Sequence, residues 1–320
     1  MQSTTSITSD NPRIKMYRQR SVGECVTATF DFVKENWKVL LRFASYLLVP
    51  LALVQGVLTN MNLESGTNGI TSIFMFSSFG VLAVYLVSFV LVTALVYSLM
   101  TIYEEREQRL SGITFDDIKP RLLKNGWRIV VLILMGILFG GMGLLLTYGL
   151  VNILSGFIIL PLWFFVMVFA IPATMILPVY LFEECIVSEA IAKGFRLGFS
   201  AWGSLFGFLI LMTIITTVVS GVMEGPLSIL LFLKVLLMEN DDLSNYRTLL
   251  SLGGLVAATV SSYISFMVAT LMPIGTAYMY GSVSEREDGL TNARDIENFE
   301  EMSQKRFDDI EDFDKTDELI

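Results

Sequence analysis

The sequence predicts an all-α polytopic membrane protein with six transmembrane helices. Of its 320 residues, 53% are hydrophobic and only 17% are charged, and the mean hydropathy is +0.63. A soluble domain of this length needs more charge on its surface. The charge is also segregated, because the residues from Ser284 onward contain 14 acidic and five basic side chains, whereas the first 283 contain 17 of each. The formal net charge of −9 therefore belongs to the C-terminal tail.

These patterns divide the chain into three parts. Residues 1–20 form a polar N-terminal segment, residues 21–283 a six-span membrane domain, and residues 284–320 an acidic tail that is disordered or weakly helical. Each predicted span is an apolar run long enough to cross a bilayer, which takes about 20 residues. The six spans are residues 37–59, 72–101, 127–148, 156–182, 202–223 and 249–280.

The spans are predicted to pair into three hairpin units, each preceded by an interfacial amphipathic helix and a tryptophan. The first such helix begins at Ser21-Val-Gly-Glu24, a capping box in which the two side chains satisfy free backbone donors. One face of this helix is apolar, and a short two-faced helix is expected to lie in the interface plane. The residues of that face are Val22, Cys25, Val26, Phe30, Val33 and Trp37.

The second and third surface helices precede Trp127 and Trp202. Thr114-Phe-Asp-Asp117 offers the second start signal, although Pro120 weakens it unless the proline lies in the first helical turn. The third helix spans 187–200 and directs its apolar residues inward, with Lys193, Arg196 and Ser200 outward. The inward residues are Val187, Ala190, Ile191, Phe195 and Leu197. The alternative to a threefold repeat is that tryptophan simply collects at membrane interfaces.

Three details of the spans carry structural expectations. Gly136 and Gly140 have the spacing that lets two membrane helices approach closely. Prolines predict a kink in the fourth span. The apolar segment Pro226–Met238 is too short to cross, so it is interpreted as interfacial or re-entrant. If the N-terminus is cytoplasmic, only Lys234 and Arg247 of the 22 basic residues fall on the opposite side of the membrane. Both termini are therefore predicted to be cytoplasmic.

The stretch around the fifth span carries a family resemblance. A span that ends with a proline and an acidic residue comes first, here Pro178 with Glu183 or Glu184. A helix with Glu189-Ala190 and Phe195-Arg196-Leu197 follows, and the next span opens with Trp202 and contains Phe206-Gly207. This order resembles the membrane domain found beside bacterial glycerophosphoryl diester phosphodiesterases, and related stand-alone inner-membrane proteins of unknown function. The opening Ser21-Val-Gly-Glu24 and Phe32-Val-Lys-Glu-Asn-Trp37 is similar to their first segment.

The resemblance covers roughly residues 18–283 and implies a multi-pass protein of the bacterial inner (cytoplasmic) membrane. The phosphodiesterase chemistry of that family resides in a separate domain that resembles a metal- and histidine-dependent barrel. This chain has no histidine, so no catalytic residue carries over.

The residue types argue against catalysis. Without histidine, the chain lacks the usual general base and the commonest transition-metal ligand. Cys25 and Cys185 are too few and too far apart for a metal-binding pattern. We therefore predict no catalytic, cofactor-binding or metal-binding residue, and no nucleic-acid partner. The middles of the six spans lack ionisable residues, and their polar residues are interpreted as interhelical packing contacts: Gln55, Tyr85, Ser88, Thr93, Thr216, Thr217, Ser262 and Ser265.

Basic residues form collars beside the three tryptophans. We predict that they contact anionic lipid headgroups between helices, and the alternative is ordinary positive-inside anchoring. The six candidates are Lys38, Arg42, Lys124, Arg128, Lys193 and Arg196.

The tail contains a short repeated motif. Asp295-Ile-Glu-Asn-Phe299-Glu recurs 14 residues later as Asp309-Ile-Glu-Asp-Phe313-Asp. The apolar residues Ile296, Phe299, Ile310 and Phe313 are candidate contacts to a cytoplasmic protein, because such a segment can dock as a short amphipathic helix. The alternative is a purely solubilising tail.

Two functions remain open at this point. The first is a non-enzymatic membrane protein in envelope or lipid homeostasis, or a scaffold for a partner bound by the tail. The second is a transporter or channel for a small or amphipathic solute. An intramembrane enzyme is disfavoured because the spans lack a group that moves protons.

Overall fold

A computed structural model describes residues 13–68, 71–154, 159–238 and 247–289, and this part of the chain contains helices but no strand. The helices are α1 (Val22–Asn68), α2 (Thr71–Glu105), α3 (Phe115–Leu154), α4 (Ile159–Ala173), α5 (Ile176–Phe182), α6 (Val187–Ser200), α7 (Trp202–Met238), α8 (Arg247–Ala269) and α9 (Leu271–Asp288).

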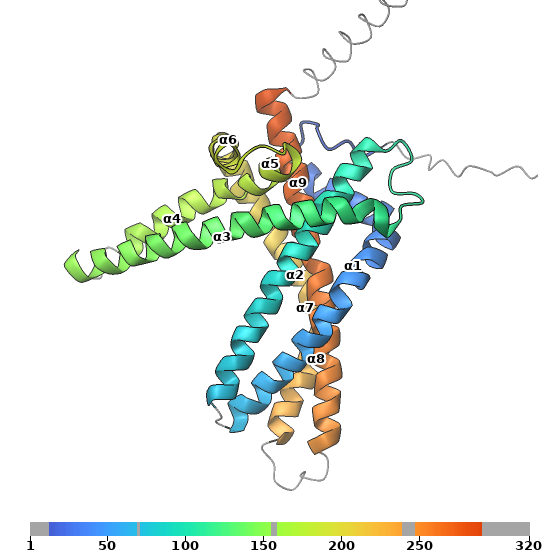
Figure 1. The fold of residues 1–320 in the computed structure, drawn as a ribbon, viewed down its shortest axis with the longest axis vertical. Coiled ribbons are helices and arrows are strands. Elements are labelled where there is room, and N and C mark those ends of the chain that lie inside the picture. Colours follow the sequence, from blue (N-terminus) through green and yellow to red (C-terminus); the bar gives the residue numbers. More distant parts are fainter. Residues whose placement is uncertain (1–12, 69–70, 155–158, 239–246, 290–320) are drawn as a thin grey trace, which may run out of the picture.

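Four long helices, α1, α2, α7 and α8, form a bundle (Figure 1). Within it, α1 packs on α2 and α8, and α7 packs on α8. The outer faces are apolar and exposed, as at Leu53, Phe79 and Val256. Among the described residues, six stretches are long and apolar enough to cross a membrane, so the prediction of a helical protein with six such stretches is confirmed. They are Val22–Leu63, Thr71–Glu105, Phe115–Gly149, Trp163–Phe182, Trp202–Leu236 and Thr248–Asp288.

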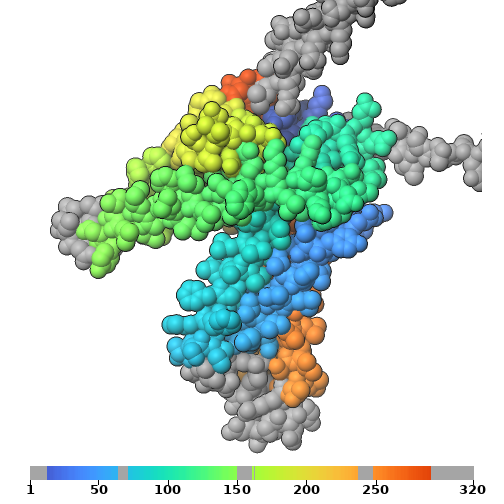
Figure 2. Space-filling model, viewed as in Figure 1, coloured from blue at the N-terminus to red at the C-terminus, as the bar shows by residue number. Residues whose placement is uncertain are grey.

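Helices α3 and α4 leave this bundle as an arm. The arm projects at a large angle to α1 and α2, and its outer half stands clear of the bundle (Figures 1 and 2). Its side chains are apolar and exposed, for example Leu138, Leu145 and Phe164. Exposed apolar residues over this length are typical of helices in contact with lipid.

The end of the bundle from which the arm projects carries a compact region, here called the head, formed by residues 13–36, 92–110, 176–200 and 271–288 (Figure 1). Aromatic side chains fill its centre: Phe32, Tyr97, Tyr103, Tyr278 and Tyr280 are buried. The backbone N–H of Arg20 donates to Ser282 Oγ at 2.8 Å, and that hydroxyl donates back to the Arg20 carbonyl at 2.9 Å. The first and last described segments therefore lie side by side at the same end of the molecule.

The predicted capping box at the start of α1 is confirmed. The Ser21 N–H donates to Glu24 Oε2 at 2.7 Å, and the Glu24 N–H donates to Ser21 Oγ at 3.3 Å. The separate surface helix expected before Trp37 is not present, because α1 continues without a break to Asn68.

The predicted apolar face of α1 is only partly buried inside the protein. Cys25 of that face is buried together with Phe32 as the helix packs against α9, whereas Phe30 and Trp37 of the same face are exposed. The Phe32 ring contacts Tyr278 of α9 edge-on, with 6.2 Å between ring centroids. A single helix has several candidate apolar faces, and the position of α9 selects among them.

The other two predicted surface helices have different outcomes. The second is the beginning of α3, which runs through Pro120 and Trp127 without interruption, and Asp117 accepts hydrogen bonds from Thr114 at its start. The third is a separate helix, α6, which ends at Ser200, so that only Ala201 separates it from the start of α7 at Trp202. Its predicted inward residues Ala190 and Leu197 are buried.

Close approach between helices occurs at a different glycine pair from the predicted one. No other described helix lies within 4 Å of a Cβ placed on Gly136 or Gly140, so the close approach predicted there is not seen among the described residues. The same four-residue spacing recurs in α6, where a Cβ on Gly194 would lie 2.8 Å from Ile176 Cα and one on Gly198 would lie 2.5 Å from Pro172 Cα. These two glycines let α6 rest on α4 and α5.

Two of the predicted spans are broken, and one is longer than expected. The fourth divides into α4 and α5, near the prolines that predicted a kink. The sixth divides into α8 and α9 at Thr270, and α9 extends to Asp288, beyond the predicted start of the tail. By contrast, α7 continues through Pro226 to Met238, so Pro226–Met238 is neither a re-entrant nor a separate interfacial segment.

Lys234 shows why α7 continues. Its side chain, predicted to lie on the non-cytoplasmic side, is only 3% exposed, and Nζ donates to Asn60 Oδ1 of α1. A Cβ on Gly254 of α8 would collide with the same side chain. Packing against α1 and α8 therefore stabilises the last turns of α7, despite the hydrogen bond that Pro226 removes.

Candidate ligand-binding cavity

Four of the six predicted lipid contacts are occupied by other groups of the protein. Lys193 Nζ lies 2.8 Å from Glu183 Oε1 and 3.0 Å from Asp288 Oδ2, and Arg196 Nη2 lies 2.8 Å from Asp288 Oδ1. These ion pairs tie α6 to α9 and to the end of α5. Lys193, predicted to point outward, is half-buried in this network.

Lys124 and Arg128, the other two of these four basic residues, connect α3 to the segment after α5. Lys124 Nζ lies 2.6 Å from Glu184 Oε1, and this hydrogen bond holds the pKa of Glu184 below its ordinary value. Arg128 donates to the carbonyls of Tyr180 and Cys185 at 2.5 and 2.8 Å, with its guanidinium stacked 4.0 Å from the Tyr180 ring centroid. Both side chains therefore have structural partners in the head.

Lys38 and Arg42 are the two basic candidates that stay at the surface. Both are exposed on α1, and neither forms an ion pair with a described carboxylate. Lys38 Nζ lies over the ring of the exposed Trp37 at 5.7 Å. They remain predicted headgroup contacts. The predicted partner-binding residues Ile296, Phe299, Ile310 and Phe313 lie outside the described residues.

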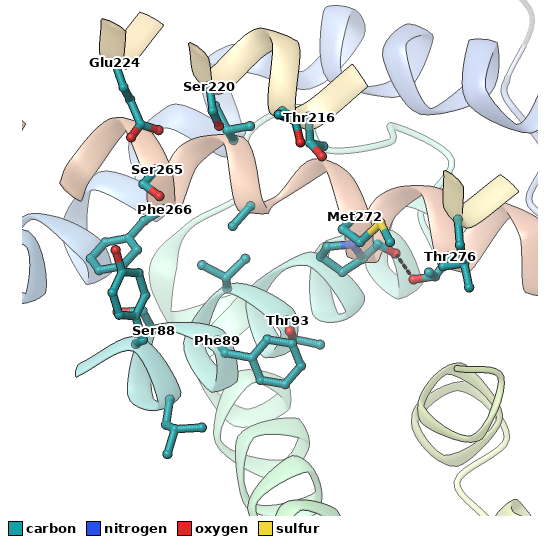
Figure 3. A pocket seen from close by; sticks show the side chains of 18 of the residues that line it. Ser88, Phe89, Thr93, Thr216, Ser220, Glu224, Ser265, Phe266, Met272 and Thr276 are labelled. Atoms are coloured by element: carbon teal, nitrogen blue, oxygen red, sulfur yellow. Dashed lines mark hydrogen bonds between the residues drawn. The ribbon is translucent and has the colours of Figure 1, made fainter. Parts of the chain in front are cut away.

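A large cavity lies between α2 and α7, with α8 and α9 as its floor (Figure 3). Its volume is about 1100 Å³, slightly above the range of about 300–1000 Å³ that is usual for small-molecule sites. Along α7 the lining extends from Leu209 to Ser228, which corresponds to about 28 Å of helix at 1.5 Å per residue. The cavity is therefore nearly as long as the hydrocarbon core is thick.

The spacing of residues in α7 places its polar groups on one face. Thr216, Ser220, Glu224 and Ser228 recur at every fourth position, so they lie one above another along the cavity. Helices α2 and α8 face this stripe mostly with apolar and aromatic side chains, including Phe89 and Phe266 (Figure 3). The site is thus an apolar chamber with one polar edge.

Polar residues that were interpreted as packing contacts meet in this cavity. The lining includes six of those eight residues: Tyr85, Ser88, Thr93, Thr216, Thr217 and Ser265. Glu224 was missed because the predicted fifth span ended at Met223. The repeat of a polar residue at every fourth position of α7 was the sequence signal that identifies it.

Glu224 is the charged side chain in the described lining. Its carboxyl group points from α7 toward α8, near Ser265 (Figure 3). Ser261 Oγ donates to Oε2 at 3.4 Å, whereas Oε1 is buried and has no hydrogen-bond partner among the described residues. A carboxylate in an apolar lining is costly to bury unless a partner satisfies it.

A second buried polar atom in the lining also lacks a partner. Ser88 is 2% exposed, and its hydroxyl makes no hydrogen bond with any residue that the structure describes. Leaving a buried polar group unsatisfied costs about 1–3 kcal/mol. Ser88 and Glu224, on opposite walls, are therefore the groups that gain most from a ligand.

Comparison with known proteins adds no assignment, because no family model, curated protein or solved structure matches the chain. The resemblance to the membrane domain beside glycerophosphoryl diester phosphodiesterases stays a prediction. No group of three or more metal-ligating side chains occurs among the described residues.

Proposed function

We propose that this protein is a non-enzymatic membrane module that binds an amphipathic molecule, such as a membrane lipid, in the cavity between α2 and α7, and so serves lipid or envelope homeostasis. The cavity carries this proposal: it is apolar, lies among helices long enough to cross a bilayer, and has a polar stripe along one edge. Apolar walls suit hydrocarbon, and a few polar groups orient the head of the ligand.

The proposal places the head on the cytoplasmic side of a bacterial inner membrane. Basic residues favour the cytoplasmic side of a membrane, and four of them lie in or beside the head: Lys124, Arg128, Lys193 and Arg196. The two described ends of the chain also meet there. Lys38 and Arg42 would then contact lipid headgroups at that surface, and the tail would extend into the cytoplasm.

The breaks in the helices favour a second candidate function, the passage of the same kind of molecule across the membrane. Thr174 lies between α4 and α5, Ala269 and Met272 flank the break between α8 and α9, and all three line the cavity. Discontinuous helices at a binding site are typical of transporters. Flux of a fluorescent lipid in proteoliposomes would identify this function.

Filling the cavity tests binding itself. No atom of a described residue lies within 4 Å of a Cβ on Gly221, so Gly221→Phe adds a ring to the cavity wall without a clash at its base. We expect native mass spectrometry of the full chain to show bound lipid in the wild type and its loss in this variant.

A neighbouring residue supplies the control. Val222 is 74% exposed on the outside of α7, so Val222→Phe adds a ring of the same kind that does not enter the cavity. Equal lipid occupancy in the wild type and both variants contradicts the proposed function.

A further inference from the structure

Three hydroxyl groups along the cavity have already donated their proton within the protein and can only accept further hydrogen bonds, whereas the Ser88 hydroxyl keeps its proton. Several lining hydroxyls donate their proton to a carbonyl of their own segment. Thr216 donates to Met212 O at 2.8 Å, Ser228 to Glu224 O at 3.0 Å and Thr276 to Pro273 O at 3.1 Å. Each of these oxygens has lone pairs left but no proton to offer.

Glu224 strengthens this acceptor character. An ionised carboxylate only accepts hydrogen bonds, and Oε1 has no donor among the described residues. None of the described residues that line the cavity is a lysine or arginine. A phosphate or carboxylate head group would therefore meet negative charge without a balancing cation.

The position of Glu224 along α7 suits contact with the polar head group of a ligand rather than with its hydrocarbon chain. It lies 22 residues beyond Trp202, or about 33 Å along the helix axis, which is about the thickness of the hydrocarbon core. Glu224 and Ser265 lie at one end of the cavity, and Thr276 lies at the other (Figure 3). A ligand whose polar head group lies at Glu224 can extend its hydrocarbon chain along the apolar wall toward Met272.

We propose that the ligand of this cavity is an amphiphile whose head carries an ammonium group, and that Glu224 binds this group. An ammonium has three donors and no acceptor, which complements the carboxylate and the adjacent hydroxyl oxygens. The charge-assisted hydrogen bonds formed in this way are stronger than neutral ones. This inference rests on the proposed binding function of the cavity and adds the chemical class of the ligand.

The test compares the binding of two probes to the full-length protein in detergent. The probes, dodecylamine and dodecan-1-ol, differ only in their polar head group. We expect the wild type to bind the amine about tenfold more tightly, the order of one charge-assisted hydrogen bond. Glu224→Gln keeps the size of the side chain and removes its charge, so it is expected to abolish this preference. Glu224→Asp keeps the charge and is expected to retain the preference with weaker binding.

A cavity-blocking variant separates the two proposals. Gly221→Phe is expected to weaken both probes, whereas Val222→Phe leaves both unchanged. If Glu224→Gln keeps the amine preference while Gly221→Phe blocks binding, the ammonium assignment is overturned and the binding function stands. If Gly221→Phe binds both probes like the wild type, the binding function itself is overturned.

A further comparison identifies the source of the ammonium group. In nanodiscs that contain equal amounts of phosphatidylethanolamine and phosphatidylglycerol, an aminophospholipid ligand would be retained on the wild type and lost in Glu224→Gln. Amine binding without selective retention of phosphatidylethanolamine would instead assign the site to lipophilic amines from outside the bilayer. Retention of phosphatidylglycerol that depends on Glu224 contradicts the proposal.

Discussion

The hydroxyl of Tyr280 donates a hydrogen bond to Glu183 Oε1, with 2.5 Å between the two oxygens. The same carboxylate oxygen lies 2.8 Å from Lys193 Nζ. Tyr280 belongs to α9, whereas Glu183 follows α5 and Lys193 lies in α6. This contact therefore joins α9 to the consecutive helices α5 and α6, which lie far from it in the sequence.

Tyr280→Phe removes the donor and leaves the ring in place. We expect a loss of about 1–3 kcal/mol, because a hydrogen bond to a charged partner contributes more than a neutral one. The measurement is the midpoint of thermal unfolding in detergent. Tyr46 is 69% exposed, so Tyr46→Phe is the matched control, and equal midpoints for the two variants would contradict the role of Tyr280.

The pairing of Lys193 predicts a dependence of stability on pH. Burial lowers the pKa of Lys193, but its hydrogen bonds and charge interactions with Glu183 and Asp288 outweigh this effect, so the pKa lies above its ordinary value of 10.5. A raised pKa in the folded state stabilises the protein below the unfolded value and loses that contribution as pH rises through the folded value.

The stability advantage of the wild type over Lys193→Met should therefore be constant from neutral pH up to about 10 and decrease above 10.5. Thermal unfolding over this range measures it. A decrease that begins near neutral pH would show that another group is responsible.

The glycines of α6 allow a direct comparison with those of α3. Gly198→Ala would place a methyl group 2.5 Å from Pro172 Cα, and overpacking of this kind costs about 1–3 kcal/mol. Gly140→Ala meets no neighbour among the described residues, so it should be neutral or stabilise α3 by up to about 1 kcal/mol. Thermal unfolding of the two single variants checks both, and destabilisation by Gly140→Ala alone would contradict the arrangement of the arm.

The two cysteines should differ in reactivity and report the orientation. Cys25 is 0% exposed, whereas Cys185 is partly exposed. We expect a membrane-impermeant maleimide to label Cys185 in inverted vesicles but not in intact spheroplasts, and to label Cys25 only after denaturation. Cys185→Ser should abolish labelling of the folded protein. Labelling of Cys185 from outside the cell would reverse the proposed topology.

The tail prediction concerns residues outside the described structure. If the repeated motif binds a cytoplasmic protein, Phe299→Ala combined with Phe313→Ala should release that partner in co-purification, because apolar anchors contribute most to such contacts. Substituting Asp295 and Asp309 with asparagine is the matched control and should weaken the complex less. Retention of every partner by the double phenylalanine variant favours a solubilising tail.

The sequence by itself determined the class of this protein and several of its helix starts. Hydropathy summed over about 20 residues identifies a membrane span whatever surrounds it. The hydrogen bonds of the Ser21 and Thr114 caps join residues three positions apart. Both signals are local, so they can be predicted before any packing is known.

Only the tertiary structure decided which faces are buried and where the candidate site lies. Ser88, Glu224 and Ser265 are separated by more than 40 residues, and the packing of α2, α7 and α8 brings them to one cavity. The same holds for Lys193, a predicted lipid-headgroup contact, which pairs with Asp288 because α9 packs against α6. Such contacts depend on how whole helices pack, because the apolar surface of a membrane helix fits several neighbours, and only the assembled bundle selects one arrangement.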